Sequence, residues 1–211
     1  MREFYFAAAL GVSAAIVASA PASAQTWSGF QNTNSVSDRY VVSFPSSYTD
    51  GEVIVSFGDR RLYYIVAKGR ALSYPIAIPR AQDTWSGVQR VSMKRVDPIW
   101  TPTATMRREN PKLPSFVPGG HPRNPLGVRA IYLGSTLYRI HGTDAPWTIG
   151  NNVSKGCVRM HNAHVIELYN RVSVGAKVTT TWNRFAASAA SSPQARNRGS
   201  QNDFDPFGLF D

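Results

Sequence analysis

The stretch HGTDAPWTIGNNVSKGCVRMHN, from His141 to Asn162, contains the only cysteine of the 211-residue chain, Cys157. A single cysteine cannot form a disulfide within its own chain, so this side chain is either a small buried apolar group or a reactive thiol. His141 lies 16 residues before it (157 − 141), far enough for the intervening loop to fold back and bring imidazole beside sulfur. From the residues alone, the structural thiol and the nucleophile both remain open.

The residues around Cys157 are of the types that promote thiolate formation and acyl transfer. Lys155 and Arg159 carry positive charge on either side of the thiol, and a helix predicted to begin at Asn162 could add its dipole to the same field. Gly156 can adopt backbone angles that other residues avoid, so the amides of Gly156 and Cys157 could converge on one oxygen atom. Such a pair of amides would form an oxyanion site.

Outside this stretch, apolar and polar residues alternate in short runs, which is typical of strands. Short turns separate the first three runs, and this predicts an antiparallel meander. A proline-rich stretch between residues 98 and 125 is expected to be irregular. The predicted strands are Glu52–Phe57, Arg61–Ala67, Ala71–Ile78, Gly87–Val96, Val128–Gly134, Leu137–Gly142 and Ala176–Trp182.

One helix is predicted directly after the cysteine loop, from Asn162 to Val174. Asn162 is a suitable N-cap, and Gly175 is a suitable end. The apolar residues between them repeat with the period of one helix face: Val165, Leu168, Tyr169 and Val172. Strands and helix together predict a single mostly-β domain over residues 40–185.

The two ends of the chain have the compositions of segments outside a folded domain. Residues 1–24 contain an apolar run and end in Ala22-Ser23-Ala24, the small-x-small pattern of a signal-peptidase site. Residues 25–39 are expected to be a polar arm, and residues 186–211 a low-complexity, disordered tail. No cysteine stands at the cleavage point, so we expect export to the periplasm without a lipid anchor.

The formal net charge is +10, which limits the classes of partner. In an exported protein this charge favours an anionic envelope surface or a carboxylate-bearing substrate, and no nucleic-acid partner is expected. Charge alone does not separate these partners from general solubility.

The stretch from His141 to Asn162 resembles the active-site signature of the L,D-transpeptidase family, also called the YkuD or ErfK/YbiS/YcfS/YnhG domain. The family pattern is His-Gly, a loop, and then Ser/Thr-x-Gly-Cys-hydrophobic-Arg-hydrophobic-x-Asn. The upstream segment PGGHPRNPLGVRAIYLG resembles the family's NPLG-x-R-A stretch, and the similarity extends from about Val53 to Trp182. The matching positions are His141, Gly142, Ser154, Gly156, Cys157, Val158, Arg159, Met160 and Asn162.

This resemblance implies a mostly β, mixed β-sandwich or barrel-like fold with a helix after the cysteine loop. It also implies a cysteine acyltransferase that acts on peptidoglycan stem peptides. Cys157 would attack the carbonyl of the third stem residue, expel the terminal D-alanine and form a thioester. The side-chain amine of another stem peptide would resolve that thioester as a 3–3 crosslink.

The same resemblance implies roles for the remaining matched residues. His141 would act as general base and then as general acid, with the Gly142 carbonyl orienting its ring. Gly156 would contribute an oxyanion amide together with Cys157. The candidate substrate-binding residues are Arg159, Ser154 and Asn162. No metal and no cofactor are expected.

Two positions depart from the family pattern. Lys155 stands where the family often has histidine, just before the Gly-Cys pair, which removes one titratable group. The usual T-P-x-G segment reads TWSG at Thr84–Gly87, a difference that is expected to alter the substrate groove.

Three alternatives remain open at this point. The same nucleophile could serve a carboxypeptidase or endopeptidase, with water as acceptor, or could attach an envelope protein to peptidoglycan through a protein amine. A zinc site could use Cys157, His161, His164 and His141, although this spacing is unfamiliar. A wall-binding module with an idle thiol is the third alternative.

Overall fold

The computed structural model describes residues 39–185. The predicted leader 1–24, nearly all of the predicted arm 25–39 and the predicted tail 186–211 lie outside the described residues. Within the described part, no helix is long and apolar enough to cross a membrane.

The predicted meander is present and forms the first part of the sheet. Strands β2 (Val53–Ser56), β3 (Arg61–Ala67) and β4 (Arg70–Pro79) pair antiparallel in chain order. Strand β1 (Tyr40–Ser43) adds to the other edge of β4, also antiparallel. The alternation that predicted these strands is the pattern of a chain whose successive side chains point to opposite faces.

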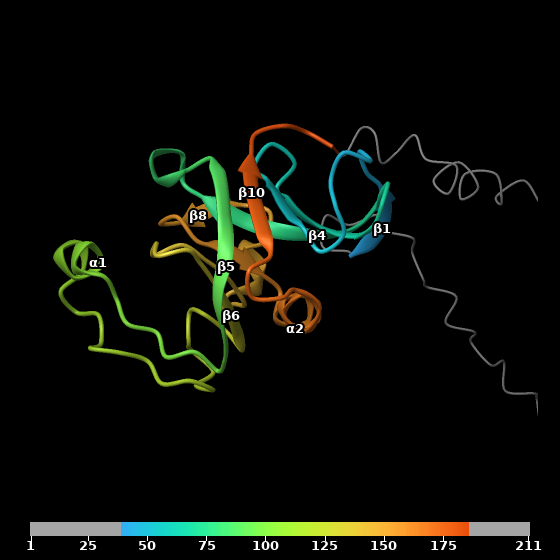
Figure 1. Ribbon diagram of the computed structural model, residues 1–211. Helices are drawn as coiled ribbons and strands as arrows, with labels where there is room; N and C mark the ends of the chain where they lie inside the picture. The colour runs from blue at the N-terminus through green and yellow to red at the C-terminus, as the bar shows by residue number, and fades with distance from the viewer. Residues whose placement is uncertain (1–38, 186–211) are drawn as a thin grey trace, which may run out of the picture. The chain divides into compact units, whose positions relative to one another are not determined.

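The long strand β4 closes the sheet on itself. Its first half pairs with β3 and β1, whereas its second half pairs antiparallel with β9 and parallel with β8. The path from β4 through β3, β2, β10, β5, β6, β7 and β9 therefore returns to β4, so the sheet is mixed, closed and barrel-like (Figure 1). The remaining strands are β5 (Gly87–Val96), β6 (Arg129–Leu133), β7 (Arg139–His141), β8 (Asn152–Ser154), β9 (Val158–Met160) and β10 (Lys177–Thr181).

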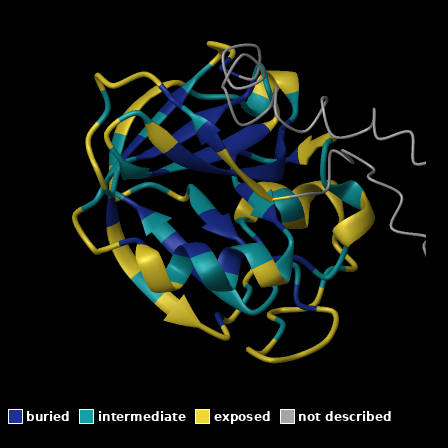
Figure 2. Ribbon diagram, turned by 90° about the vertical axis from the view of Figure 1, so that its right-hand side faces the viewer, coloured by how far each residue is buried: buried dark blue, intermediate teal, exposed yellow. Residues whose placement is uncertain are grey.

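Apolar side chains fill the inside of this closed sheet. Figure 2 shows buried residues in the strands at the middle of the domain, whereas exposed residues lie in the loops, on the helices and on strand segments at the outside, among which β5 is mostly exposed. A second, smaller apolar cluster covers the outer face of the meander, where Phe44 and Tyr63 pack around Phe185 with ring centroids 4.7 and 5.7 Å from it. Phe185 is therefore part of the packed domain, near the end of the described residues.

Helix α2 (Asn162–Arg171) follows the cysteine loop as predicted, and it packs on β6 and β7. Two details of the prediction are wrong. His161, not Asn162, occupies the N-cap position, and the helix ends three residues before Val174. Val172 has extended backbone angles, but its side chain is only 2% exposed, so its apolar character reflects burial in the core rather than continued helix.

The proline-rich stretch between β5 and β6 contains a short helix that the sequence did not predict. Helix α1 (Ala104–Glu109) begins after Thr103, whose hydroxyl accepts a hydrogen bond from the Met106 amide at 3.2 Å. Asn124 fixes the end of this stretch, because its buried side-chain amide donates to the carbonyls of Pro98 and Pro118 at 2.8 and 3.0 Å. The Asn of the NPLG motif therefore holds the long connection between the strands together.

The Gly of the same motif allows the connection to touch the end of β7. Gly127 has a positive φ of 60°, and a Cβ there would lie 2.4 Å from the Thr143 amide nitrogen and 2.7 Å from the Gly142 carbonyl carbon. A side chain would therefore clash with backbone that cannot move without displacing the chain around His141.

We predict that Gly127→Ala lowers the free energy of unfolding by about 3 kcal/mol, from left-handed strain and overpacking together. Gly51→Ala is the matched control, because Gly51 also has positive φ (85°) but a Cβ there meets nothing within 4 Å. The control should lose only about 1 kcal/mol in urea unfolding. Equal losses in the two variants would contradict the close approach of Gly127 to β7.

Candidate active site

The parallel pairing of β7 with β9 brings the segments that carry the predicted nucleophile and base side by side. Ile140 pairs with Val158, and His141 pairs with Arg159. Ile140 and Val158 are completely buried in the core, so the alternate residues His141 and Arg159 point to the other face. Cys157 directly precedes β9 and lies two residues before Arg159, so the same pairing brings the cysteine loop alongside β7.

The Cys157 thiol is sheltered by strand β7 and the residues just before it. Its sulfur lies 3.6 Å from the carbonyl oxygen of Leu137. Burial raises the pKa of Cys157 above its ordinary value, while the backbone and side chain of Arg139 and the charge of Arg159 act in the opposite direction. The thiol is therefore protonated at neutral pH. The guanidinium groups of Arg139 and Arg159 would stabilise the thiolate once it forms.

The His141 ring is fixed in one tautomer. Its Nδ1 lies 2.6 Å from the Gly142 carbonyl oxygen, and a carbonyl can only accept, so Nδ1 carries the hydrogen and Nε2 keeps a free lone pair. Burial lowers the pKa of His141 to about 3, with Arg159 acting in the same direction. The ring is therefore neutral at neutral pH. At neutral pH the site therefore holds a neutral thiol and a neutral imidazole.

Asn162 braces the loop that follows His141. Its side-chain oxygen accepts from the Thr143 amide at 3.0 Å, and its side-chain nitrogen donates to the Thr143 carbonyl at 2.9 Å. Both polar groups of Asn162 are thus used within the protein, although the resemblance implied substrate binding. The sequence gives no direct signal for this contact, because Thr143 lies 19 residues away.

The loop before Cys157 is held through its carbonyl groups. The Ser154 hydroxyl donates to the Cys157 carbonyl, so this side chain, also expected to bind substrate, points into its own loop. Gly156 has φ of 107°, a conformation that side chains rarely adopt. Within residues 39–185, neither the Gly156 nor the Cys157 amide donates to another backbone group, so both are available to an oxyanion.

Two aromatic residues that the sequence reasoning did not select also contact this loop. The indole N–H of Trp85 donates to the Gly156 carbonyl at 2.8 Å. The Trp85 ring stacks on Tyr138, with centroids 4.5 Å apart and planes 5° from parallel. The sequence shows that TWSG departs from T-P-x-G, but it does not show that Trp85 contacts the cysteine loop.

Arg139 is a further site residue that the sequence reasoning passed over. It precedes His141 by two residues on the same strand, so the alternation of β7 places both side chains on one face. Its guanidinium lies 5.0 Å from the Tyr132 ring centroid, and its Nη1 donates to the Leu137 carbonyl at 2.9 Å. The alternation R-I-H could have identified it.

Lys155 and Arg159 have partners on the loops around the thiol. The Lys155 ammonium forms an ion pair with Glu109 at the end of α1, so it ties the long connection to the cysteine loop. Arg159 donates to the Thr148 hydroxyl at 2.9 Å, and burial lowers its pKa. The Nε of Arg159 is buried without a partner among the described residues.

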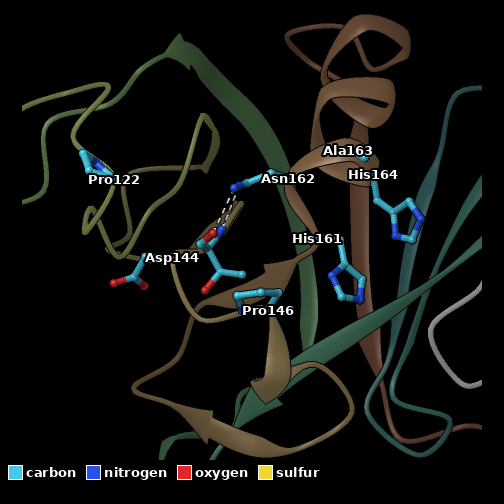
Figure 3. Close-up of a pocket in the computed structure, with 8 residues that line it drawn as sticks. Pro122, Asp144, Pro146, His161, Asn162, Ala163 and His164 are labelled. Atoms are coloured by element: carbon cyan, nitrogen blue, oxygen red, sulfur yellow. Dashed lines mark hydrogen bonds between the residues drawn. The ribbon is translucent and has the colours of Figure 1, made fainter.

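A pocket of about 620 Å³ adjoins the site, between the loop after His141 and the start of α2. Figure 3 shows the rings of His161 and His164 on one side of this pocket and Asp144 near Pro122 on the other. In the described part of the chain, no three metal-ligating side chains gather into a possible metal site, so the zinc alternative lacks its geometry.

The free energy of unfolding should decrease as the pH falls, because His141 is buried in its neutral form. Its pKa is 6.5 in the unfolded chain and about 3 in the folded one, so between these values only the unfolded chain binds the proton. Stability is therefore full above pH 6.5 and is lost as the pH falls towards 3. We predict that His141→Gln removes up to about 1.4 kcal/mol of this loss per pH unit.

Urea unfolding at pH 7 and pH 5 measures this slope. His161 and His164, whose pKa values burial also lowers, remain in the variant and retain part of the dependence. Ser47→Ala, at an exposed turn and without an ionisable side chain, is the control and should keep the wild-type slope. An unchanged slope in His141→Gln would mean that the imidazole is not buried in its neutral form.

Comparison with known proteins agrees with this geometry. Residues 50–179 match the model of the L,D-transpeptidase catalytic domain, YkuD. The "Probable L,D-transpeptidase ErfK/SrfK" of Escherichia coli strain K12 is 41% identical over 133 residues, which cover 60% of this chain and 42% of that protein. The "Probable L,D-transpeptidase YbiS" of the same strain is 40% identical over 142 residues, or 64% of this chain and 45% of that protein. The matched region thus spans somewhat less than half the length of these relatives.

A solved structure titled "Structure of the Ldtfm-avibactam carbamoyl enzyme" has a TM-score of 0.52 and 20% identity. The match covers 65% of this chain and 51% of that one, and it supports the fold. The family model covers more than half of the chain, including both sequence motifs and every strand from β2 to β9. The chain therefore belongs to the YkuD family of L,D-transpeptidase catalytic domains.

Proposed function

We propose that this protein is an exported cysteine L,D-transpeptidase that acts on peptidoglycan stem peptides through a Cys157 thioester. The observation that supports the proposal is the β7–β9 register, which pairs His141 with Arg159, two residues after Cys157, and so brings the imidazole-bearing strand next to a loop whose Gly156 and Cys157 amides donate to no other backbone group within residues 39–185. The predicted leader is consistent with a periplasmic location.

The acylation step uses the free lone pair of His141. As the Cys157 sulfur attacks the carbonyl carbon of the third stem residue, Nε2 takes the thiol proton. The amides of Gly156 and Cys157 hold the oxygen of the tetrahedral intermediate. When the intermediate collapses, the C–N bond breaks, and the departing D-alanine amine takes the proton back from Nε2. The thioester remains, and the imidazole is neutral again.

Deacylation repeats these steps in reverse with a second amine. The side-chain amine of another stem peptide attacks the thioester carbon and gives a proton to Nε2. The carbon–sulfur bond then breaks, and Nε2 returns the proton to the thiolate. The product is a 3–3 crosslink, and the enzyme is restored.

Charge supports the choice of nucleophile and of substrate. Arg139 and Arg159 both lower the pKa of Cys157 against the effect of burial, so they favour the thiolate that attacks. The positive charge of the Arg159 guanidinium, whose Nη1 donates to the Thr148 hydroxyl, would also attract a carboxylate of the stem peptide.

The acceptor decides which product the thioester gives. An amine of a stem peptide gives a crosslink, water gives carboxypeptidase or endopeptidase activity, and an amine of an envelope protein gives protein attachment. Incubation of the mature protein with purified wall, followed by mass spectrometry of the muropeptides, separates these products by mass. We expect 3–3 crosslinked dimers, and only shortened stems would indicate that water is the acceptor.

We predict that Cys157→Ser retains the fold and loses at least about a thousandfold in turnover, because a hydroxyl is a far weaker nucleophile than a thiol beside the same base. A carbapenem should add its own mass to the wild-type protein and not to the variant, as seen by intact-mass measurement. Ser47→Ala, at an exposed turn, is the control and should behave as wild type. Wild-type turnover in Cys157→Ser would exclude the thioester.

We also predict that the thiol reacts as a group with a raised pKa. The rate of Cys157 alkylation by iodoacetamide should have its midpoint above the ordinary pKa of a thiol, because burial dominates. Arg139→Gln should move the midpoint higher, since it removes a cation that favours the thiolate. Arg108→Gln, on the exposed face of α1, should leave it unchanged. A midpoint below the ordinary value would mean that the site rests as a thiolate–imidazolium pair instead.

A further inference from the structure

Trp85 reaches the cysteine loop from a distant part of the sequence. It follows the short 3₁₀ helix η1 (Ala81–Asp83), 71 residues before the group that its indole contacts. The same segment is tied to the loop at a second point, because the Arg80 amide donates to the Ser154 carbonyl at 3.0 Å. These two contacts align the segment along the loop that ends at Cys157.

The carbonyl that Trp85 holds belongs to the same peptide group as the Cys157 amide. A trans peptide group is planar, and its C=O and N–H point in opposite directions. A donor that fixes the Gly156 carbonyl at 2.8 Å therefore also fixes the direction of the Cys157 N–H. That N–H donates to no other backbone group within residues 39–185, so it stays available beside the nucleophile.

The indole itself is held on two sides. It stacks on Tyr138 and meets Phe57 edge to face, with ring centroids 6.5 Å apart and planes at 84°. The Tyr138 ring also supports the loop, because a Cβ on Gly156 would lie only 2.6 Å from Tyr138 Cε1. The donor and its carbonyl are thus placed by packing before any substrate binds, which is what electrostatic preorganisation requires.

We propose that Trp85 is a positioning residue for acyl transfer, whose indole N–H aims the Cys157 amide at the developing oxyanion. This inference rests on the proposed function. It gives a physical reason for TWSG in place of T-P-x-G, because proline at this position has no side-chain donor.

Two reactions of the same sulfur test this role. Acylation by a carbapenem develops negative charge on a carbonyl oxygen, whereas alkylation by iodoacetamide does not. Trp85→Phe keeps an aromatic ring on Tyr138 and removes the donor. We expect the acylation rate constant to fall about tenfold, a fraction of the loss seen when an oxyanion donor itself is removed. The alkylation rate should stay within about twofold, because the thiol keeps its own surroundings.

A second variant removes the N–H without the change in packing that Trp85→Phe causes. Benzothienylalanine at position 85 keeps the bicyclic ring and lacks only the N–H, so it should reproduce the selective loss of acylation. Trp182→Phe is the matched control. The Trp182 ring packs on the same Phe57 at 5.5 Å, and no side-chain hydrogen bond from it is found among the described residues. This control should retain the wild-type rate of acylation.

The outcomes separate the two proposals. A selective loss of acylation in both position-85 variants supports the role of Trp85. Equal losses of acylation and alkylation, or no loss in either, would overturn that role. The proposed function would still hold in that case, because the wild-type protein is acylated. If wild-type Cys157 is alkylated but never acylated, by carbapenem or by stem peptide, the proposed function fails and this inference fails with it.

Discussion

Parallel pairing of two three-residue strands, β7 and β9, is the constraint on which the site depends. A slip of one residue in either strand would turn its side chains to the opposite face, so that Ile140 would replace His141 beside the thiol. The register is secured by the complete burial of Ile140 and Val158 in the closed sheet. It is secured again from the other edge of β9, where β4 pairs with Met160 and Arg159.

The neutral resting state follows from the same burial. Removing His141 from water disfavours the imidazolium, and removing Cys157 from water disfavours the thiolate, so neither charge forms before substrate arrives. In the proposed mechanism, the proton then moves only as the sulfur–carbon bond forms. In that mechanism, the hydrogen bond to the Gly142 carbonyl becomes stronger when the ring gains charge, and the amides of Gly156 and Cys157 would stabilise the oxyanion at the same moment. Charge separation is thus confined to the part of the reaction that needs it.

Alternation in the sequence predicted most of the sheet because its strands are long enough to show a two-residue period. The bounds of β3 and β5 agree with the prediction, whereas β8 and β9 have only three residues and show no period. Within the site, the positions of His141 and Cys157 could be anticipated, because both lie in one motif. Trp85 and Asn162 could not be assigned their contacts, since those arise only when segments 71 and 19 residues apart fold together.

The cysteine loop is ordered mainly by groups outside it. Three separate parts of the chain brace it: the segment around Trp85, strand β7 with Tyr138 beneath Gly156, and helix α1 through the Glu109–Lys155 ion pair. These contacts engage the Gly156 carbonyl, the Gly156 Cα and the Lys155 ammonium, and none of them uses the Gly156 or Cys157 amide. A loop that satisfied its own amides would be equally rigid but could not stabilise an oxyanion. The contacts from other segments therefore let the site be rigid and still keep its donors free for substrate.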